Sequence, residues 1–127
     1  MPLEIAEKFK ILKQEIHHLK KNIDWDKSNS ELKSLVKISE EDGFWDDPKN
    51  AQNIMKEIKV KENIINLINK INQDYLDLKD LIELAESEND NDLINELDNS
   101  LDVLIKKSSK YKIETMFSDK NDFSNCF

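Results

Sequence analysis

The sequence of 127 residues contains no arginine, a single glycine, a single cysteine and two prolines. Sheet proteins need many tight turns, which glycine commonly supplies, so the lone Gly43 disfavours a β architecture. Without arginine the chain lacks the two-pronged guanidinium group that reads phosphate or guanine, and its net charge is −8. Direct binding of nucleic acid is therefore not expected.

The chain also lacks the segments that direct a protein into or across a membrane. Met1 is followed by Pro2 and a charged stretch rather than by the apolar core of a signal peptide. No apolar run approaches the roughly 20 residues that span a bilayer. Cys126 has no second cysteine with which to form an internal disulfide. These features predict a cytoplasmic protein without a membrane partner.

What is abundant is typical of long helices: 38% hydrophobic and 36% charged residues. In three stretches the hydrophobic residues recur at spacings of three and four, which places them along one side of a helix. These seams are Ile5, Phe9, Leu12, Ile16, Leu19 and Ile23; then Ala51, Met55, Ile58, Ile64, Ile68, Ile71, Tyr75, Leu78, Ile82 and Ala85; and finally Ile94, Leu97, Leu101, Leu104 and Tyr111. The pattern predicts an all-α, elongated bundle of about four helices with a long antiparallel, coiled-coil-like helical hairpin.

Start and stop signals locate the second helix of this bundle. Residues 24–27 have the composition of a connection, and Ser28 with Glu31 has the spacing of a capping box. The helix is expected to stop near Glu41, because Gly43 can adopt the left-handed conformation that ends helices.

The two longest helices are predicted to start and end at polar signals. Asp47 followed by Pro48 is a strong start signal, since a carboxylate can accept the first backbone N–H groups and proline has a helical φ. A long helix from Pro48 to about Glu86 is expected, and the polar run 86–92 separates it from the last helix. Residues 1–117 are then one helical domain, and residues 118–127 have the pattern of a turn and strand that begin another, α/β, domain.

Residue types that carry chemistry are present, but their spacing does not favour a site. His17 and His18 are adjacent, so on a helix they point about 100° apart and cannot converge on one metal ion. The acidic runs lie at helix ends, where capping and solubility explain them and where no calcium-loop spacing exists. Cys126 has no histidine near it in sequence. No catalytic, cofactor-binding or metal-binding residue is predicted, and no cofactor is expected.

The least generic segment is Phe44, Trp45, Asp46, Asp47 and Pro48, between a helix stop and a helix start. Two adjacent aromatic residues at such a place usually form a local plug that buries against the bundle and fixes the angle between helices. The alternative is an exposed aromatic contact point for a partner. The plug is the preferred interpretation.

The 44–48 motif, followed by Ala51 and Gln52 and a long acidic helical hairpin, resembles the N-terminal domain of bacterial peptide chain release factors of type 2. Further landmarks are similar in the same order, and they cover essentially the whole chain. They are Asp24-Trp25-Asp26, Ile82-Glu83-Leu84-Ala85 and Met116-Phe117-Ser118. The family usually has paired arginines and a glycine around the last landmark, where this chain has Glu114, Thr115 and Asp119.

The resemblance implies a domain that positions a translation termination factor on the ribosome, toward the stalk base of the large subunit. The family reads stop codons and releases the peptide through a Ser-Pro-Phe type tripeptide and a Gly-Gly-Gln motif in later domains, and neither motif occurs here. A fragment that is inactive alone, whose partners are the ribosome and the rest of the factor, is therefore expected. The alternative is a free-standing coiled-coil module that binds a partner helix along an exposed seam.

Overall fold

The computed structural model describes residues 2–117, and the expected second-domain stub at 118–127 lies outside the described residues. The described part consists of four α-helices and one short 3₁₀ helix, without a strand. They are α1 (Leu3–Asn22), α2 (Trp25–Ser39), η1 (Phe44–Asp46), α3 (Pro48–Ser87) and α4 (Asn91–Phe117). The predicted all-α fold of four helices is confirmed.

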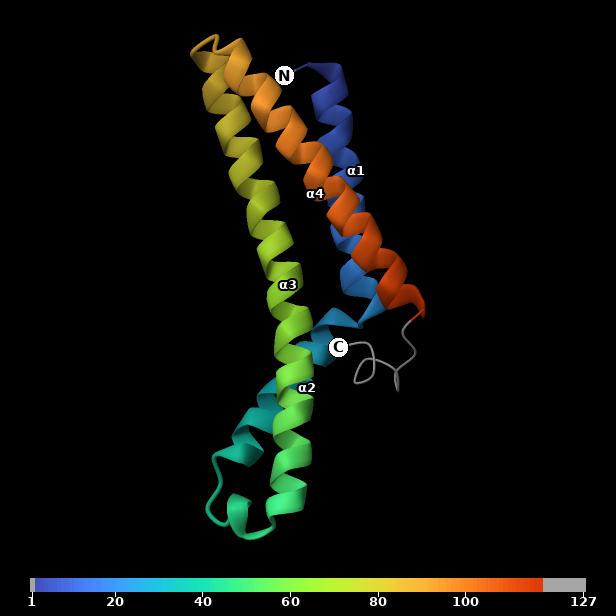
Figure 1. Cartoon of the computed structure of the whole chain (residues 1–127), viewed down its shortest axis with the longest axis vertical. Coiled ribbons are helices and arrows are strands. Elements are labelled where there is room, and N and C mark those ends of the chain that lie inside the picture. The colour runs from blue at the N-terminus through green and yellow to red at the C-terminus, as the bar shows by residue number, and fades with distance from the viewer. Residues whose placement is uncertain (1, 118–127) are drawn as a thin grey trace.

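Helix α3 is the longest of these helices and runs along the length of an elongated molecule (Figure 1). Its 40 residues extend over about 60 Å at about 1.5 Å per residue. Helices α1 and α4 pack beside its C-terminal half, and α2 and η1 beside its N-terminal half. We call these parts the three-helix region and the two-helix region.

The helical hairpin of α3 and α4 is closed by residues 88–90, and the two helices run in opposite directions (Figure 1). Away from the loop, α4 leans toward α1, and it contacts α1 more extensively than it contacts α3. The α3–α4 pair is therefore one side of a three-helix arrangement. Its coiled-coil character stays a prediction.

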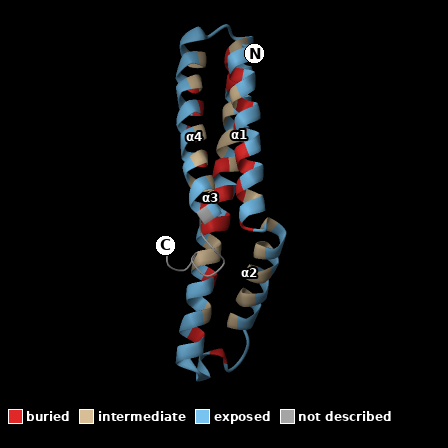
Figure 2. Cartoon of the chain, turned by 90° about the vertical axis from the view of Figure 1, so that its right-hand side faces the viewer, coloured by how far each residue is buried: buried red, intermediate tan, exposed pale blue. Residues whose placement is uncertain are grey.

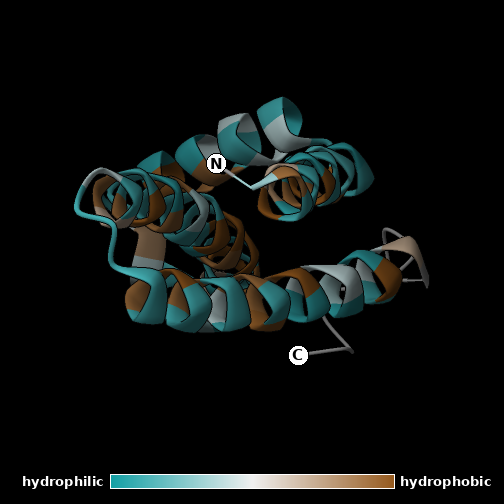
Figure 3. Cartoon of the chain, turned by 90° about the horizontal axis from the view of Figure 1, so that it is seen from above, coloured by the Kyte–Doolittle hydropathy of each residue, from teal (hydrophilic) through white to brown (hydrophobic). Residues whose placement is uncertain are grey.

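The core lies where the three helices face one another (Figures 2 and 3). All six residues of the first seam are buried, and so are most of the later seam positions. Tyr75, Leu78, Ile94 and Tyr111 are half-buried and pack against this core. Met55 is different: it was predicted to face the core, but 41% of its surface is exposed. It lies in the two-helix region, where one neighbouring helix cannot enclose the whole seam.

Polar contacts join α1 to α4 near the start of α1. The Lys8 Nζ donates a hydrogen bond to Asp98 Oδ1 at 2.7 Å and lies 2.9 Å from Asp102 Oδ1. The two aspartates are four residues apart, so they lie on the same face of α4. They raise the pKa of Lys8 above its ordinary value, through hydrogen bonds first to Asp98 and then to Asp102. This pair of salt bridges holds one helix against the other.

A second group of polar contacts joins the same two helices further along. Glu15 is buried and accepts hydrogen bonds from Lys112 Nζ at 2.9 Å and from Ser109 Oγ at 3.2 Å. At the end of α1, the Asn22 amide donates to Thr115 Oγ1 at 3.0 Å. A buried carboxylate is tolerated only with such partners. The sequence patterns gave no sign of these pairs, because their members lie more than 90 positions apart.

Helix α2 begins earlier than predicted. Asp24 has a left-handed φ of 54°, and the helix starts directly at Trp25, so most of the expected connection is helical. The predicted capping box is therefore wrong: Ser28 lies in the first turn and its hydroxyl donates to the carbonyl of Ile23. Glu31 instead accepts a hydrogen bond from Lys61 of α3 at 2.8 Å. The Glu31 carboxylate thus joins α2 to α3 instead of capping α2.

The α3–α4 loop is shorter than the polar run 86–92 that was predicted to form it. Helix α3 continues to Ser87, and α4 already starts at Asn91. Asn89 adopts a left-handed φ of 55°, and Asp90 caps α4 by accepting a hydrogen bond from the Leu93 N–H at 3.1 Å. Polar composition alone could not show that residues at both ends of the run are helical.

Candidate interaction surfaces

The aromatic motif forms a tight turn at the end of the two-helix region. Gly43 has a φ of +81°, a conformation that residues with a Cβ rarely adopt, and a Cβ there would lie 3.0 Å from Asp46 Oδ2. The Phe44 N–H donates to the Glu41 carbonyl at 3.2 Å, and the Asp46 N–H donates to the Gly43 carbonyl at 3.0 Å. The glycine predicted to end the second helix thus opens the 3₁₀ turn η1 that carries the two aromatic residues.

The two aromatic residues of the motif have opposite environments. Phe44 is 9% exposed, whereas Trp45 is 60% exposed. Their rings meet edge to face, with centroids 5.1 Å apart at an angle of 82°. Phe44 is thus buried as the plug interpretation predicts, whereas the exposed Trp45 contradicts it. That the motif fixes the angle between helices stays a prediction. Consecutive residues of a 3₁₀ helix point about 120° apart, so only one of them can face α3.

Asp47 and Pro48 start α3 as predicted. The Asp47 side chain accepts a hydrogen bond from the Asn50 N–H at 3.3 Å, and its carbonyl accepts one from the Ala51 N–H at 3.0 Å. Pro48 occupies the first turn of the helix, where the missing N–H has no partner to lose. The motif therefore fixes both the entry into α3 and the position of Trp45 beside it.

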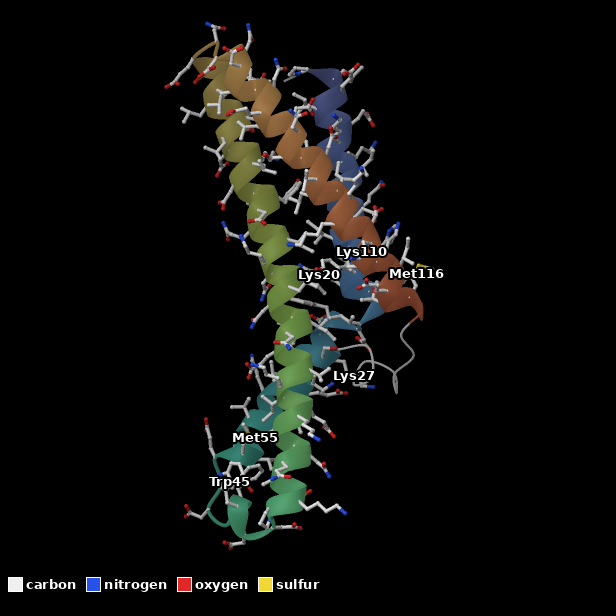
Figure 4. The ribbon with its side chains drawn as sticks, in the orientation of Figure 1. Lys20, Lys27, Trp45, Met55, Lys110 and Met116 are labelled. Atoms are coloured by element: carbon white, nitrogen blue, oxygen red, sulfur yellow. The ribbon has the colours of Figure 1, made fainter. Side chains whose placement is uncertain are left out.

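Other hydrophobic side chains are exposed at the same end of the molecule. Met55 lies on α3, in the part that is next to Trp45 in the view of Figure 4, and η1 packs against this helix. Ile38, in the last turn of α2, is 39% exposed. The connection around them is acidic, with exposed carboxylates at Glu40, Glu41, Asp42, Asp46 and Asp47. We call Ile38, Trp45, Met55 and these five carboxylates the tip surface.

A groove lies in the three-helix region, between α3 and α4. This groove has a volume of about 330 Å³, and most of its lining surface is apolar; two of its hydrophobic residues, Leu81 and Val103, are 44% and 66% exposed. Its lining consists of Asp74, Asp77, Leu78, Leu81, Ser100, Val103, Leu104 and Lys107. Asp74 is engaged in a salt bridge with Lys70 at 2.7 Å, which raises the pKa of that lysine. The groove carries charges of both signs.

The residue types with metal-binding or catalytic potential lie apart. His17 and His18 are both exposed, with ring centroids 6.1 Å apart. Between residues 2 and 117, no group of three His, Cys, Asp or Glu side chains is placed to hold a metal ion. Cys126 lies outside the described residues. Among the helices that the structure describes, none is long and apolar enough to cross a membrane.

Comparison with known proteins identifies a family that the chain matches. The model of the PCRF domain matches residues 28–127. The chain is similar to "Peptide chain release factor 2" of Shewanella baltica, with 33% identity over 122 residues that cover 94% of this chain. The proteins of the same name from Nitratiruptor sp. and Nautilia profundicola are 34% and 30% identical, each over 96% of this chain. The chain spans about one third of the length of these curated relatives, 33% in each case.

Proposed function

Because the chain belongs to the PCRF domain family, we propose that it is the ribosome-positioning domain of a stop-codon-dependent translation termination factor. The observation that carries the proposal is the family match, which includes α3, α4 and most of α2. The ordered landmarks point the same way: Phe44, Trp45 and Pro48 lie at one end of α3, and the Ile82–Ala85 landmark lies near the other.

The shape of the chain suits a spacer with contacts at separate places. Helix α3 connects the tip surface to the α3–α4 loop over about 60 Å, and α1 and α4 stiffen half of that length. A helix enclosed by two others resists bending more than an isolated helix does. We propose that this rigidity sets the placement of the remaining two thirds of the factor on the ribosome, with the stalk base of the large subunit as the docking place.

We further propose that this chain takes no chemical part in peptide release. The family's Gly-Gly-Gln and Ser-Pro-Phe type motifs do not occur in its sequence. The helices bury their hydrophobic seams and expose charged outer faces, an arrangement that suits packing and docking. The proposed place of action is the cytoplasm, where the ribosome is found, and the proposed partners are the ribosome and the rest of the factor.

Binding to purified bacterial ribosomes tests the positioning role. We expect the chain to co-sediment saturably with ribosomes and to be displaced by the full-length Shewanella baltica release factor 2. A Leu101→Asp variant provides the unfolded control, because a charge at this fully buried position disrupts the core. Sedimentation that is absent, that the competitor leaves unchanged, or that the unfolded variant reproduces would contradict the proposal.

A peptide-release assay tests the second part. We expect no release of peptide from ribosomes stalled at a stop codon when the chain is added alone, and normal release with the full-length relative. Stop-codon-dependent release by the chain would refute its inactivity.

Analytical ultracentrifugation addresses the alternative function. A stable oligomer that does not bind ribosomes would favour a free-standing coiled-coil module.

A further inference from the structure

The tip surface exposes large hydrophobic side chains on a charged protein. Trp45 is 60% exposed, Met55 41% and Ile38 39%. Tryptophan is over-represented among residues that dominate the binding energy of protein interfaces, because it buries a large area when a partner covers it. In this chain the other tryptophan, Trp25, is half-buried against the core, so Trp45 is the one available to a partner.

The position of Trp45 is held by the structure around it. The left-handed Gly43 and the hydrogen bonds of η1 fix the backbone, and the Asp47 cap fixes the start of α3. The buried Phe44 ring contacts the indole edge to face at 5.1 Å. A side chain that is already ordered loses less conformational entropy when it binds. The tip surface is therefore preorganised for contact.

The charge around Trp45 identifies the kind of partner. Between Lys37 and Lys49 the chain carries five exposed carboxylates and no lysine. The salt bridges found within residues 2–117 do not include any of the five. A phosphate-rich partner such as RNA would be repelled here. Lysine or arginine side chains would be attracted, and each could also lie over the exposed indole face in a cation–π contact.

The α3–α4 groove lacks this selectivity. Its rim combines Lys107 with Asp74 and Asp77, and Asp74 is already paired with Lys70. Its exposed hydrophobic residues are aliphatic. The groove therefore does not favour a partner of one charge, whereas the tip surface does.

We propose that the tip surface binds a lysine- or arginine-rich amphipathic protein segment. Basic side chains of this segment would face the carboxylates, and a hydrophobic or arginine side chain would cover Trp45. Binding of a basic segment at the tip surface is additional to the positioning role, because it does not require the chain to bind the ribosome. A failure of ribosome binding and a failure of this site are therefore separate results.

The intrinsic fluorescence of Trp45 tests the proposal directly. In a Trp25→Phe background Trp45 is the sole tryptophan, so its emission reports on the tip surface alone. The probes are a short helical peptide of lysine and leucine and a peptide in which glutamate replaces each lysine. We expect a saturable emission shift with the lysine peptide that weakens with added salt, and no shift with the glutamate peptide. No saturable shift with the lysine peptide, or equal shifts with both peptides, would overturn the proposal.

Variants separate a defined site from general attraction to an acidic protein. Isothermal titration calorimetry with the lysine peptide should show about tenfold weaker binding for Trp45→Ala. The double variant Glu41→Gln, Asp42→Asn should also bind more weakly. Its matched control, Asp80→Asn with Glu83→Gln, removes two exposed charges from the far half of α3 and should retain binding.

Circular dichroism of each variant verifies that the helices are intact. The tryptophan at position 45 and both changed carboxylates are exposed, so loss of the fold is not expected. Equal losses for the tip and control double variants, or unchanged binding by Trp45→Ala, would show that only net charge matters. Either result would overturn the proposal.

Discussion

The three-helix and two-helix regions are built from the same kind of sequence but are stabilised differently. In the three-helix region, the hydrophobic seams of α1, α3 and α4 pack against one another. Leu12, Leu19, Ile71 and Leu101 are fully buried there. In the two-helix region, α2 has no buried residue, and the buried residues in the N-terminal half of α3 are Ala51, Ile58, Ile64 and Ile65. Two helices can cover only one stripe of each other, whereas a third closes the core. The number of neighbouring helices, more than the seam itself, therefore decides how far a residue is buried.

The largest expected difference between the regions comes from truncating one leucine in each. Leu101→Ala creates a cavity at a fully buried position and should lower the free energy of unfolding by about 2–5 kcal/mol. Leu32→Ala on the half-buried face of α2 should cost clearly less, because solvent already reaches the site. Chemical denaturation measures both. Val103→Ala, at an exposed position, is the control and should stay within about 0.5 kcal/mol. Equal losses for the two leucines would contradict the comparison.

Phe44 tests whether the two-helix region depends on its single buried aromatic residue. Phe44→Ala should lower stability by roughly 1–3 kcal/mol, with the effect confined to the end where η1 packs on α3. Hydrogen exchange should become faster in α2 and the first turns of α3 but not in α1 or α4. Trp45→Ala is the matched aromatic control and should leave exchange nearly unchanged. An equal acceleration in α1 and α4 would show that the regions do not behave independently.

The cap of α3 gives a smaller, local effect. Asp47→Ala removes the acceptor for the Asn50 N–H and should cost about 1 kcal/mol, as capping losses usually do. The measurement is the midpoint of urea unfolding together with amide exchange at residues 50–52. Asp46→Ala changes a neighbouring exposed carboxylate that does not cap the helix. If both variants lost the same stability, general charge effects rather than capping would be responsible.

The smallest effect concerns the α1–α4 salt bridges and their dependence on pH. The pKa of Lys8 is raised above its ordinary value of 10.5 by hydrogen bonds to Asp98 and Asp102. The folded state therefore holds this proton more tightly than the unfolded chain. The resulting stabilisation is fully present below pH 10.5 and is lost as the pH rises through the higher pKa of the folded state.

Lys8→Met should therefore be less stable than the natural sequence at neutral pH, and this difference should shrink in alkaline solution. Thermal unfolding followed by circular dichroism from pH 7 to 11.5 measures the difference. Lys110→Met, which removes an exposed charge from α4, provides the comparison. A difference that grew with pH would contradict the assigned direction of the pKa shift.

Much of the fold follows from local patterns that are legible in the sequence. The spacing of three and four identified the helices and most core positions, since residues on one stripe must be buried together. Asp47-Pro48 started α3 as predicted, because capping depends on neighbouring residues alone. Gly43 adopted the expected left-handed φ, but it lies four residues after the last residue of α2 and opens η1 instead of ending that helix. The start of α2 was misplaced because Ser28 has an alternative partner, the Ile23 carbonyl. A capping pattern shows that a cap is possible, and competing hydrogen bonds decide whether it forms.

The interaction surfaces were only partly predictable. The sequence singled out Phe44 and Trp45 but could not divide them into a buried and an exposed residue. That division depends on how η1 packs against α3. The α3–α4 groove was not predicted, because its lining comes from two segments that are brought together only by the turn at 88–90.

Local sequence patterns specify that this protein is helical, which faces of its helices are hydrophobic, and where its longest helix begins. These properties depend on interactions between residues within a few positions of one another. Three features depend on tertiary packing: α4 packs chiefly on α1, Lys8 and Glu15 join these two helices, and Trp45 remains exposed. A seam shows that a face must be covered, but which helix covers it depends on contacts between residues far apart in the chain.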